Sequence, residues 1–393
     1  MKSCWPGEMW PSAVLDVLFS CLVVGPAVVG YWRGTWALAE HYIVPQDPTL
    51  SAWISLCIGC VSHLVFNFVQ GPLQRHVAKW NCVAWLLVSR LYTAFFSFAC
   101  VNCWRGVWQT LEHYTGSDLS ALMVTTTAAI IALAVMRTLR NIAAPPFAIV
   151  IDARPGYFQF PTMFRVSPGS KDPALHTLDC VFSVFVIGSL VVIVWRGTWG
   201  ILDIILMPED PNTSAWLSLA IGYGVTVVGF ALQVPARIAC DKLSGGPRLI
   251  VADLYQFLCF CGTVNLWRGI WNLLDIYLLP ETPLVSFWVT HWVCLIVLMI
   301  LNCGNSLLVR GVYIDGEEEG GQCVVFQVNY LRYHYKEKRK RQAAAQVQGH
   351  SGHSGTEKRK DMDVRGPPGA GPGLENHHVH VPLMTHTLRD TIL

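Results

Sequence analysis

The residues of this chain best suited to chemistry are four arginines, each held in the pattern Trp-Arg-Gly-x-Trp. An acidic residue follows each arginine at an offset of seven. The copies comprise Trp32, Arg33, Gly34 and Trp36; Trp104, Arg105, Gly106 and Trp108; Trp195, Arg196, Gly197 and Trp199; Trp267, Arg268, Gly269 and Trp271; the acids are Glu40, Glu112, Asp203 and Asp275. A guanidinium group pairs with carboxylates, binds anions and stacks on indole faces, so the motif offers electrostatic chemistry.

Helical geometry narrows what this motif can do. Positions i and i+4 share a helix face, so the two tryptophans of each copy form one aromatic patch. The arginine and the acid also share a face but lie about 10.5 Å apart along the axis, which favours pairing between neighbouring copies. The glycine after the arginine would let another helix approach closely.

Two interpretations of the four copies are open. In the favoured one, arginines and acids neutralise one another and the tryptophans anchor the membrane interface. In the alternative, a ring of four guanidinium groups binds an anionic headgroup or solute. In both, the arginines lie toward the outer leaflet, because each copy sits toward the end of a long apolar run.

Composition identifies the setting as a membrane. The 393 residues are 53% hydrophobic and only 14% charged, whereas soluble domains carry about a quarter charged residues. A spanning helix needs about twenty apolar residues. The runs that qualify are roughly 12–38, 50–70, 81–111, 119–140, 176–205, 214–235, 249–277 and 285–309. We therefore predict an all-α polytopic membrane protein with eight transmembrane helices.

The distribution of basic residues predicts the orientation. One set of connections is basic, and the set between them, near 40–50, 112–118, 203–213 and 275–284, has acids but no Lys or Arg. The basic set contains Arg75, Lys79, Arg137, Arg140, Arg154, Arg165, Lys171, Arg237, Lys242 and Arg248. Eight spans then place both termini in the cytosol, with the acidic connections outside the cell.

The chain repeats itself at an offset of 163 residues. Asp16 matches Asp179, and Ser51-Ala52-Trp53 matches Ser214-Ala215-Trp216. A weaker repeat of 72 residues divides each half, from Trp32 to Trp104 and from Trp195 to Trp267. We predict two parallel four-helix halves, built from four helical hairpins whose helices are joined by the acidic connections. Their symmetry axis should run along the membrane normal.

The predicted spans divide the chain into segments. They are a cytosolic N-terminus over 1–11, a first membrane half over 12–144, a cytosolic loop over 145–175, a second membrane half over 176–310, a cytosolic segment over 311–335 and a disordered tail over 336–393. β-Branched and aromatic runs flank turn residues in 145–175 and again in 311–335, which predicts a β-hairpin in each. We expect the two hairpins to pair into a small sheet beneath the bundle.

Other polar residues in the spans favour structural roles. Asn102 and Asn265 precede two of the motifs, where we expect each to bridge to a neighbouring helix. Asp16 and Asp179 lie near helix starts, where an acid complements the helix dipole.

No catalytic pattern is present. The sequence has no phosphate-binding glycine loop, no nucleophile elbow and no zinc-protease signature. Its fourteen cysteines show neither a disulfide framework nor paired zinc spacing. We expect no enzyme activity, no catalytic residues, no metal, no cofactor and no nucleic-acid partner.

The C-terminal residues carry a different signal. Thr391 and Leu393 match a hydroxyl residue two positions before a final apolar residue, the ligand pattern for strand addition to a PDZ domain. Leu393 would fill a pocket while its carboxylate binds backbone N–H groups. We therefore expect a PDZ scaffold as a partner of the tail.

The motif copies and the eight-helix plan resemble the Fuseless family of invertebrate multi-pass proteins over about residues 12–335. The resemblance implies a neuronal plasma-membrane protein of the presynaptic terminal that supports calcium-channel localisation and transmitter release. Partners would then be the lipid bilayer, a voltage-gated calcium channel complex and the PDZ scaffold. The rival hypothesis, a transporter or channel, draws on the parallel repeats and on charged residues at membrane depth.

Overall fold

The computed structural model describes residues 10–77, 79–166 and 172–343. The chain divides into one unit that ends at His334 and a second that begins at Tyr335. The first unit contains all the transmembrane candidates. The predicted PDZ ligand, Thr391 and Leu393, lies outside the described residues.

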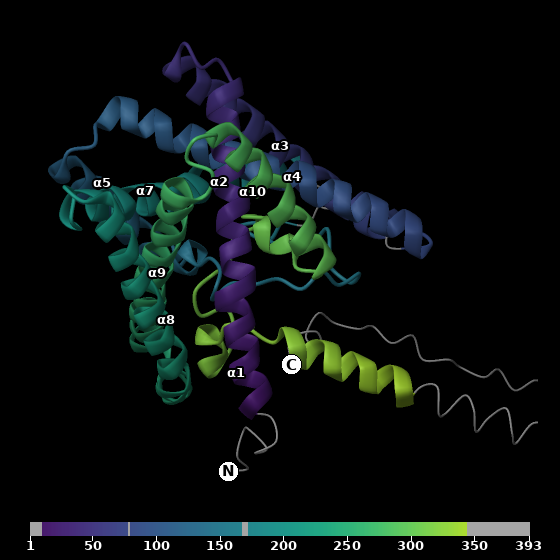
Figure 1. Ribbon diagram of the computed structural model, residues 1–393. Coiled ribbons are helices and arrows are strands. Elements are labelled where there is room, and N and C mark those ends of the chain that lie inside the picture. The colour runs from purple at the N-terminus through teal and green to yellow at the C-terminus, as the bar shows by residue number, and fades with distance from the viewer. Residues whose placement is uncertain (1–9, 78, 167–171, 344–393) are drawn as a thin grey trace, which may run out of the picture. The chain divides into compact units, whose positions relative to one another are not determined.

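Long apolar helices form the first unit (Figure 1). They are α1 (Trp10–Phe19), α2 (Gly25–Tyr42), α3 (Pro48–Val77), α4 (Cys82–Thr115), α5 (Leu119–Val135), α6 (Pro173–Val181), α7 (Gly188–Ile205), α8 (Pro211–Lys242), α9 (Gly245–Tyr277) and α10 (Pro283–Ile300). A π-helical turn joins α1 to α2 at Ser20–Val24, and another joins α6 to α7 at Phe182–Ile187. Within the described residues, seven continuous helices are long and apolar enough to cross a membrane, and the 17-residue α5 is a shorter apolar helix.

Local sequence explains where these helices begin. Asp47 and Asp210 precede Pro48 and Pro211 and accept hydrogen bonds from N–H groups of the first turn, as N-cap acids do before a proline. Asp118 does the same for α5. Large apolar side chains such as Val83 and Leu254 stay exposed, at 78% and 66%, which suits helices that face lipid. An all-helical, multi-pass membrane protein is therefore confirmed.

The helices pack in pairs, and the pairs differ from the predicted hairpins. Each motif helix, α2, α4, α7 or α9, packs most extensively against a partner, respectively α10, α3, α5 or α8. The pairs α3–α4 and α8–α9 are joined at the basic end of the bundle, not through an acidic connection as we predicted. The pair α10–α2 joins the last of these helices to the first and so closes the bundle.

Glycine explains this choice of partner. A Cβ at Gly34, Gly106, Gly197 or Gly269 would lie less than 3.0 Å from an atom of the facing helix, which is α10, α3, α5 or α8. The glycine of each motif is thus a point of close approach within its helix pair, as its position after arginine predicts. Gly59 and Gly222 make the reciprocal approach to the motif helices α4 and α9.

The two predicted β-hairpins are wrong. The described residues of 145–175 and 311–335 contain no strand, and the 3₁₀ turn Gly320–Val324 replaces part of the second. Their backbone groups bond instead to side chains of the bundle. Phe160 N–H donates to Gln70 at 3.0 Å, and Phe326 N–H donates to Gln233 at 3.1 Å. With these groups already bonded, no strand ladder forms.

At the basic end, a carboxylate that follows each half accepts hydrogen bonds from backbone N–H groups of the other half. Asp152, after the first half, accepts N–H groups of Gly304 and Asn305 at 3.0 and 2.9 Å. Asp315, after the second half, accepts N–H groups of Leu139 and Arg140 at 2.7 and 3.0 Å. Burial raises the pKa of both carboxyl groups, and these N–H groups oppose the rise. The two segments therefore meet beneath the bundle, but through side-chain caps and not through a sheet.

Two further acids fasten connecting segments to the helices. Asp16 accepts from Arg332 at 2.6 Å, and Asp179 accepts from Phe164 N–H at 2.9 Å. Both acids are fully buried, and neither lies in the first turn of its helix. They therefore serve as anchors and not as partners of a helix dipole. Residues 330–343 are helical, which corrects the predicted disorder over 336–343; the rest of the tail lies outside the described residues.

The glycine contacts predict a large position dependence for alanine substitution. Gly106→Ala places a Cβ against the backbone of α3 and should cost about 1–3 kcal/mol through overpacking. Gly224→Ala in α8 meets nothing within 4 Å and should be neutral or stabilising by up to about 1 kcal/mol. The measurement is the thermal unfolding midpoint of the purified protein in detergent. Equal midpoints for the two variants would contradict the close approach.

Candidate functional site

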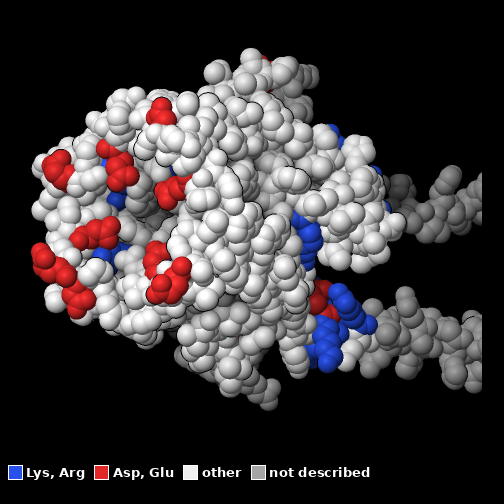
Figure 2. All heavy atoms as spheres, turned by 45° about the horizontal axis from the view of Figure 1, so that its top comes forward, with Lys and Arg blue, Asp and Glu red and all other residues white. Residues whose placement is uncertain are grey.

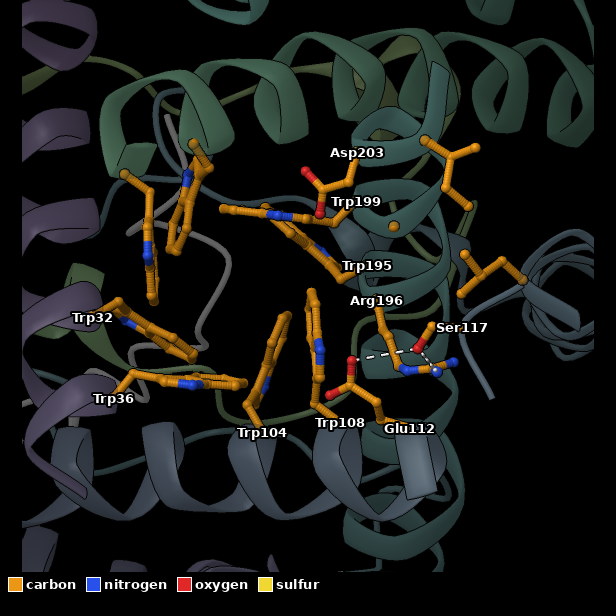
Figure 3. Close-up of a pocket in the computed structure, with 15 residues that line it drawn as sticks. Trp32, Trp36, Trp104, Trp108, Glu112, Ser117, Trp195, Arg196, Trp199 and Asp203 are labelled. Carbon is orange, nitrogen blue, oxygen red and sulfur yellow. Dashed lines mark hydrogen bonds between the residues drawn. The ribbon is translucent and has the colours of Figure 1, made fainter. Parts of the chain in front are cut away.

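The tryptophans of the four motifs form two closed rings around one axis (Figure 3). The deep ring is Trp32, Trp104, Trp195 and Trp267, with adjacent ring centroids 5.2, 5.6, 5.2 and 5.8 Å apart. The rim ring is Trp36, Trp108, Trp199 and Trp271, with spacings of 5.6, 6.1, 5.8 and 6.1 Å. All eight contacts are edge to face, the arrangement that aromatic quadrupoles prefer.

Hydrogen bonds fix the orientation of the deep ring. The indole N–H groups of Trp32, Trp195 and Trp267 donate to the main-chain oxygens of Leu307, Ile142 and Pro145, at 3.3, 3.0 and 2.8 Å. These acceptors belong to the segments at the basic end of the bundle. In the rim ring, Trp36 N–H donates to Glu40 at 2.8 Å. The donors of four indoles are thus already bonded.

The two rings surround a cavity of about 460 Å³. All eight tryptophans line it, together with Glu112, Ser117, Leu122, Arg196, Gly200, Asp203 and Ile204. Figure 2 shows acidic side chains gathered around a hollow in the molecular surface. We call this the acidic end of the bundle. The cavity is therefore an aromatic vestibule with charged groups at its mouth.

The four motif arginines are buried, with exposed fractions of 2 to 3%. Two of them form direct ion pairs with the acid of a neighbouring copy. Arg33 donates to Asp275 and Arg268 donates to Asp203, each at 2.7 Å. Serine hydroxyls of the paired helix accept from other donors of these two arginines: Arg268 reaches Ser218 at 2.6 Å in α8, and Arg33 reaches Ser286 at 3.1 Å in α10. These guanidinium groups therefore lie in the interfaces between paired helices.

The other two arginines lack a direct ion pair among the described residues. Arg105 donates to the hydroxyls of Ser51, at 2.7 Å, and Ser55. Arg196 donates to the main-chain oxygen of Gly116 at 2.6 Å. Each still interacts electrostatically with an acid of a neighbouring copy, Arg105 with Glu40 and Arg196 with Glu112. Charge compensation thus runs around the ring, each arginine facing the acid of the copy before it.

The glutamates consequently bond to neutral donors. Glu40 accepts from Trp36 and, at 2.9 Å, from Gln109, and Glu112 accepts from Ser117 at 3.4 Å. Neither glutamate forms an ion pair within the described part of the chain. The aspartates of the second half form direct ion pairs. The glutamates of the first half interact with their arginines without a direct ion pair, so their carboxylate oxygens remain free of salt bridges to described residues.

Comparison with known proteins identifies the family of the chain. A family model described as Fuseless matches residues 12–308. The chain belongs to the Fuseless family. No curated protein and no solved structure matches the chain. The predicted resemblance to the Fuseless family is confirmed over the helices that carry the four motifs.

In the structure, the motif tryptophans and the motif arginines lie in different places. All eight motif tryptophans meet on the axis, whereas only Arg196 among the motif arginines lines the vestibule. Of the acids, Glu112 and Asp203 line it. Neighbouring copies do exchange charge, as the seven-residue offset predicts. The predicted Asn102 and Asn265 bridges are wrong, since each amide donates to an oxygen four residues earlier in its own helix, at 2.9 Å.

Sequence reasoning missed the hydroxyl acceptors of the arginines. Ser51 and Ser55 bond Arg105, while Ser214 and Ser218 bond Arg268. Both pairs recur at the offset of 163 and lie four residues apart, on one helix face. This spacing in an apolar helix was the available signal.

Within this Fuseless-family chain, the contacts predict different effects for two charge-removing substitutions. Arg268→Gln breaks an ion pair and leaves two buried serines with altered partners, so it should lower the thermal unfolding midpoint and reduce surface expression. A loss of about 1–3 kcal/mol is expected, since Asp203 is 51% exposed and partly rehydrates. The matched variant Glu112→Gln breaks no direct ion pair and removes only the interaction with Arg196, so it should change both quantities much less than Arg268→Gln does. A wild-type midpoint for Arg268→Gln would contradict the structural role of the arginine.

Proposed function

We propose that this protein is a plasma-membrane organiser of a presynaptic complex. In that role it supports calcium-channel localisation and transmitter release, and its cytosolic tail binds a PDZ scaffold. Membership of the Fuseless family supports the proposal. The carrying observation is that ion pairs and hydrogen bonds hold the motif arginines within helix interfaces, because such contacts favour a rigid body on which other membrane proteins can pack.

The proposal includes eight spans with both termini in the cytosol. Helix α5 has 17 residues, the lower end of the range for a spanning helix. It packs on α7 as α3 packs on α4 and α8 on α9, which supports its counting as a full span. An even number of spans then places both termini on the basic side, in agreement with the positive-inside rule.

The rival function is a transporter or channel, and the open vestibule favours it. A ring of four guanidinium groups facing an anionic solute is less well supported, because only Arg196 lines the cavity. Flux of radiolabelled anions and cations into liposomes containing the purified protein distinguishes the two functions. Protein-dependent flux favours transport, and its absence from vesicles with verified insertion favours the organiser.

The organiser proposal makes a prediction about the C-terminus. Appending one alanine after Leu393 displaces the free carboxylate, so it should abolish capture by PDZ domains and reduce protein at nerve terminals. Calcium-channel clustering there should fall with it. Immunostaining of neurons that express the variant in place of the endogenous protein measures both quantities.

The control for this experiment is Thr391→Ser, which keeps the hydroxyl group and should behave as wild type. Normal capture and normal channel clustering with the appended alanine would contradict the tether. Normal clustering in neurons that lack the whole protein would contradict the organising role itself.

A further inference from the structure

We propose that the tryptophan vestibule is a binding site for an alkylammonium cation that enters from the acidic end. The site comprises the deep and rim rings, with Glu112 and Asp203 at the mouth. The proposal does not depend on the organiser function, since a scaffold and a transporter could each carry such a site.

Four of the eight indoles that line the cavity already have their N–H groups hydrogen-bonded within the protein. The negative face of an indole attracts cations, whereas its N–H group would attract anions. Trp32, Trp195 and Trp267 direct their N–H groups to main-chain oxygens, and Trp36 directs its own to Glu40. What these four residues leave for a ligand is π surface and ring edges, which favours a cation.

The mouth of the vestibule is rich in negative charge. Glu40 and Glu112 lack ion-pair partners among the described residues, and both are exposed or half-buried at the surface. The connections at this end hold further acids and no Lys or Arg: Asp47, Asp118, Glu209, Asp210 and Glu281. The hydrogen bond from the Thr213 hydroxyl, with those from the N–H groups of Thr213 and Asn212, lowers the pKa of Asp210. The approach to the vestibule is therefore through negative potential.

The positive charges near the vestibule are already compensated. Arg33, Arg105 and Arg268 do not line the cavity. Arg196 does, but it donates to the Gly116 oxygen at 2.6 Å and interacts with Glu112. The lining thus contains one arginine and two carboxylates, those of Glu112 and Asp203, and Asp203 is paired with Arg268 outside the lining.

The dimensions of the rim ring favour an organic cation over a metal ion. Rim-ring neighbours lie 5.6 to 6.1 Å apart, so opposite indoles are about 8 Å apart, roughly twice a carbon–carbon contact distance. One N-methyl or methylene group fits between them. Among the described residues no cluster of three metal-ligating side chains exists. An apolar cage would also offset little of the hydration energy that a small metal ion loses on entry. An alkylated ammonium group loses far less and matches aromatic cages.

Two sources could supply this chemistry: a free quaternary ammonium compound, or the choline headgroup of a membrane lipid. Binding is measured with choline on the full-length protein in nanodiscs made either of phosphatidylglycerol or of phosphatidylcholine. Intrinsic tryptophan fluorescence gives the affinity, and the ring-current shift of the N-methyl protons reports insertion between indoles. Choline should bind in phosphatidylglycerol discs with an upfield N-methyl signal. Equal binding in phosphatidylcholine discs identifies a free ligand, and competition there identifies the lipid headgroup.

Substitutions test each component of the site. Trp108→Leu should weaken choline binding at least about tenfold through loss of one cage wall, and Trp108→Phe should restore most of it. Glu112→Gln, which breaks no ion pair, should weaken binding about fivefold. The matched controls are Trp216→Leu, a 52% exposed tryptophan that does not line the vestibule, and Glu319→Gln, an exposed acid at the basic end that does not line it either.

A neutral ligand of the same shape completes the test. 3,3-Dimethyl-1-butanol replaces the ammonium nitrogen of choline with carbon, so it should bind at least about tenfold more weakly. Equal affinity for this alcohol would show a merely apolar cavity and overturn the proposal. The proposal is also overturned if choline fails to bind in phosphatidylglycerol discs, or if Trp108→Leu and Glu112→Gln bind like their controls.

Discussion

The spacing of Trp-Arg-Gly-x-Trp on a helix is the constraint on which the rest of the structure depends. At about 100° per residue, the two tryptophans share one face and the glycine lies on nearly the opposite face. Four such helices bring their tryptophans together on an axis and turn their glycines outward. Each glycine then admits an outer helix, so Gly34 and Gly106 set the pairs α2–α10 and α3–α4. One five-residue pattern thus determines both the centre and the periphery of the bundle.

The same spacing determines where the arginine side chains lie. An arginine next to a tryptophan that faces the axis must point into the interface between helices, where serine hydroxyls and a neighbouring acid receive it. In the second half, short aspartate side chains close direct pairs, as Asp203 does with Arg268. In the first half, the longer glutamates bond instead to neutral donors. The two halves therefore share an architecture but differ in how much charge each leaves at the acidic end.

Sequence reasoning predicted the features that depend on local periodicity and missed those that depend on distant partners. Helix positions, the close approach at glycine and charge exchange between copies depend on spacing within a few turns. The β-hairpins failed because Gln70 and Gln233, far away in sequence, bind the backbone that a sheet would have used. The alternative in which four arginines line a cavity was wrong, since only Arg196 does so. The direction of an arginine side chain depends on which helices pack against each other. That choice became visible only with the glycine contacts.

The tryptophans lie on the axis of the bundle and most motif arginines do not, so a ligand in the vestibule would contact mainly aromatic groups. Edge-to-face tryptophans tie all four motif helices to one another, so a group inserted between them contacts every pair of helices at once. The deep ring also bonds the segments at the basic end, through Leu307, Ile142 and Pro145. Occupancy of the vestibule and the position of these segments are thus connected by direct contacts, without any need for a polar path through the molecule. A group bound in the vestibule would therefore touch the same tryptophans that hold the segments at the basic end.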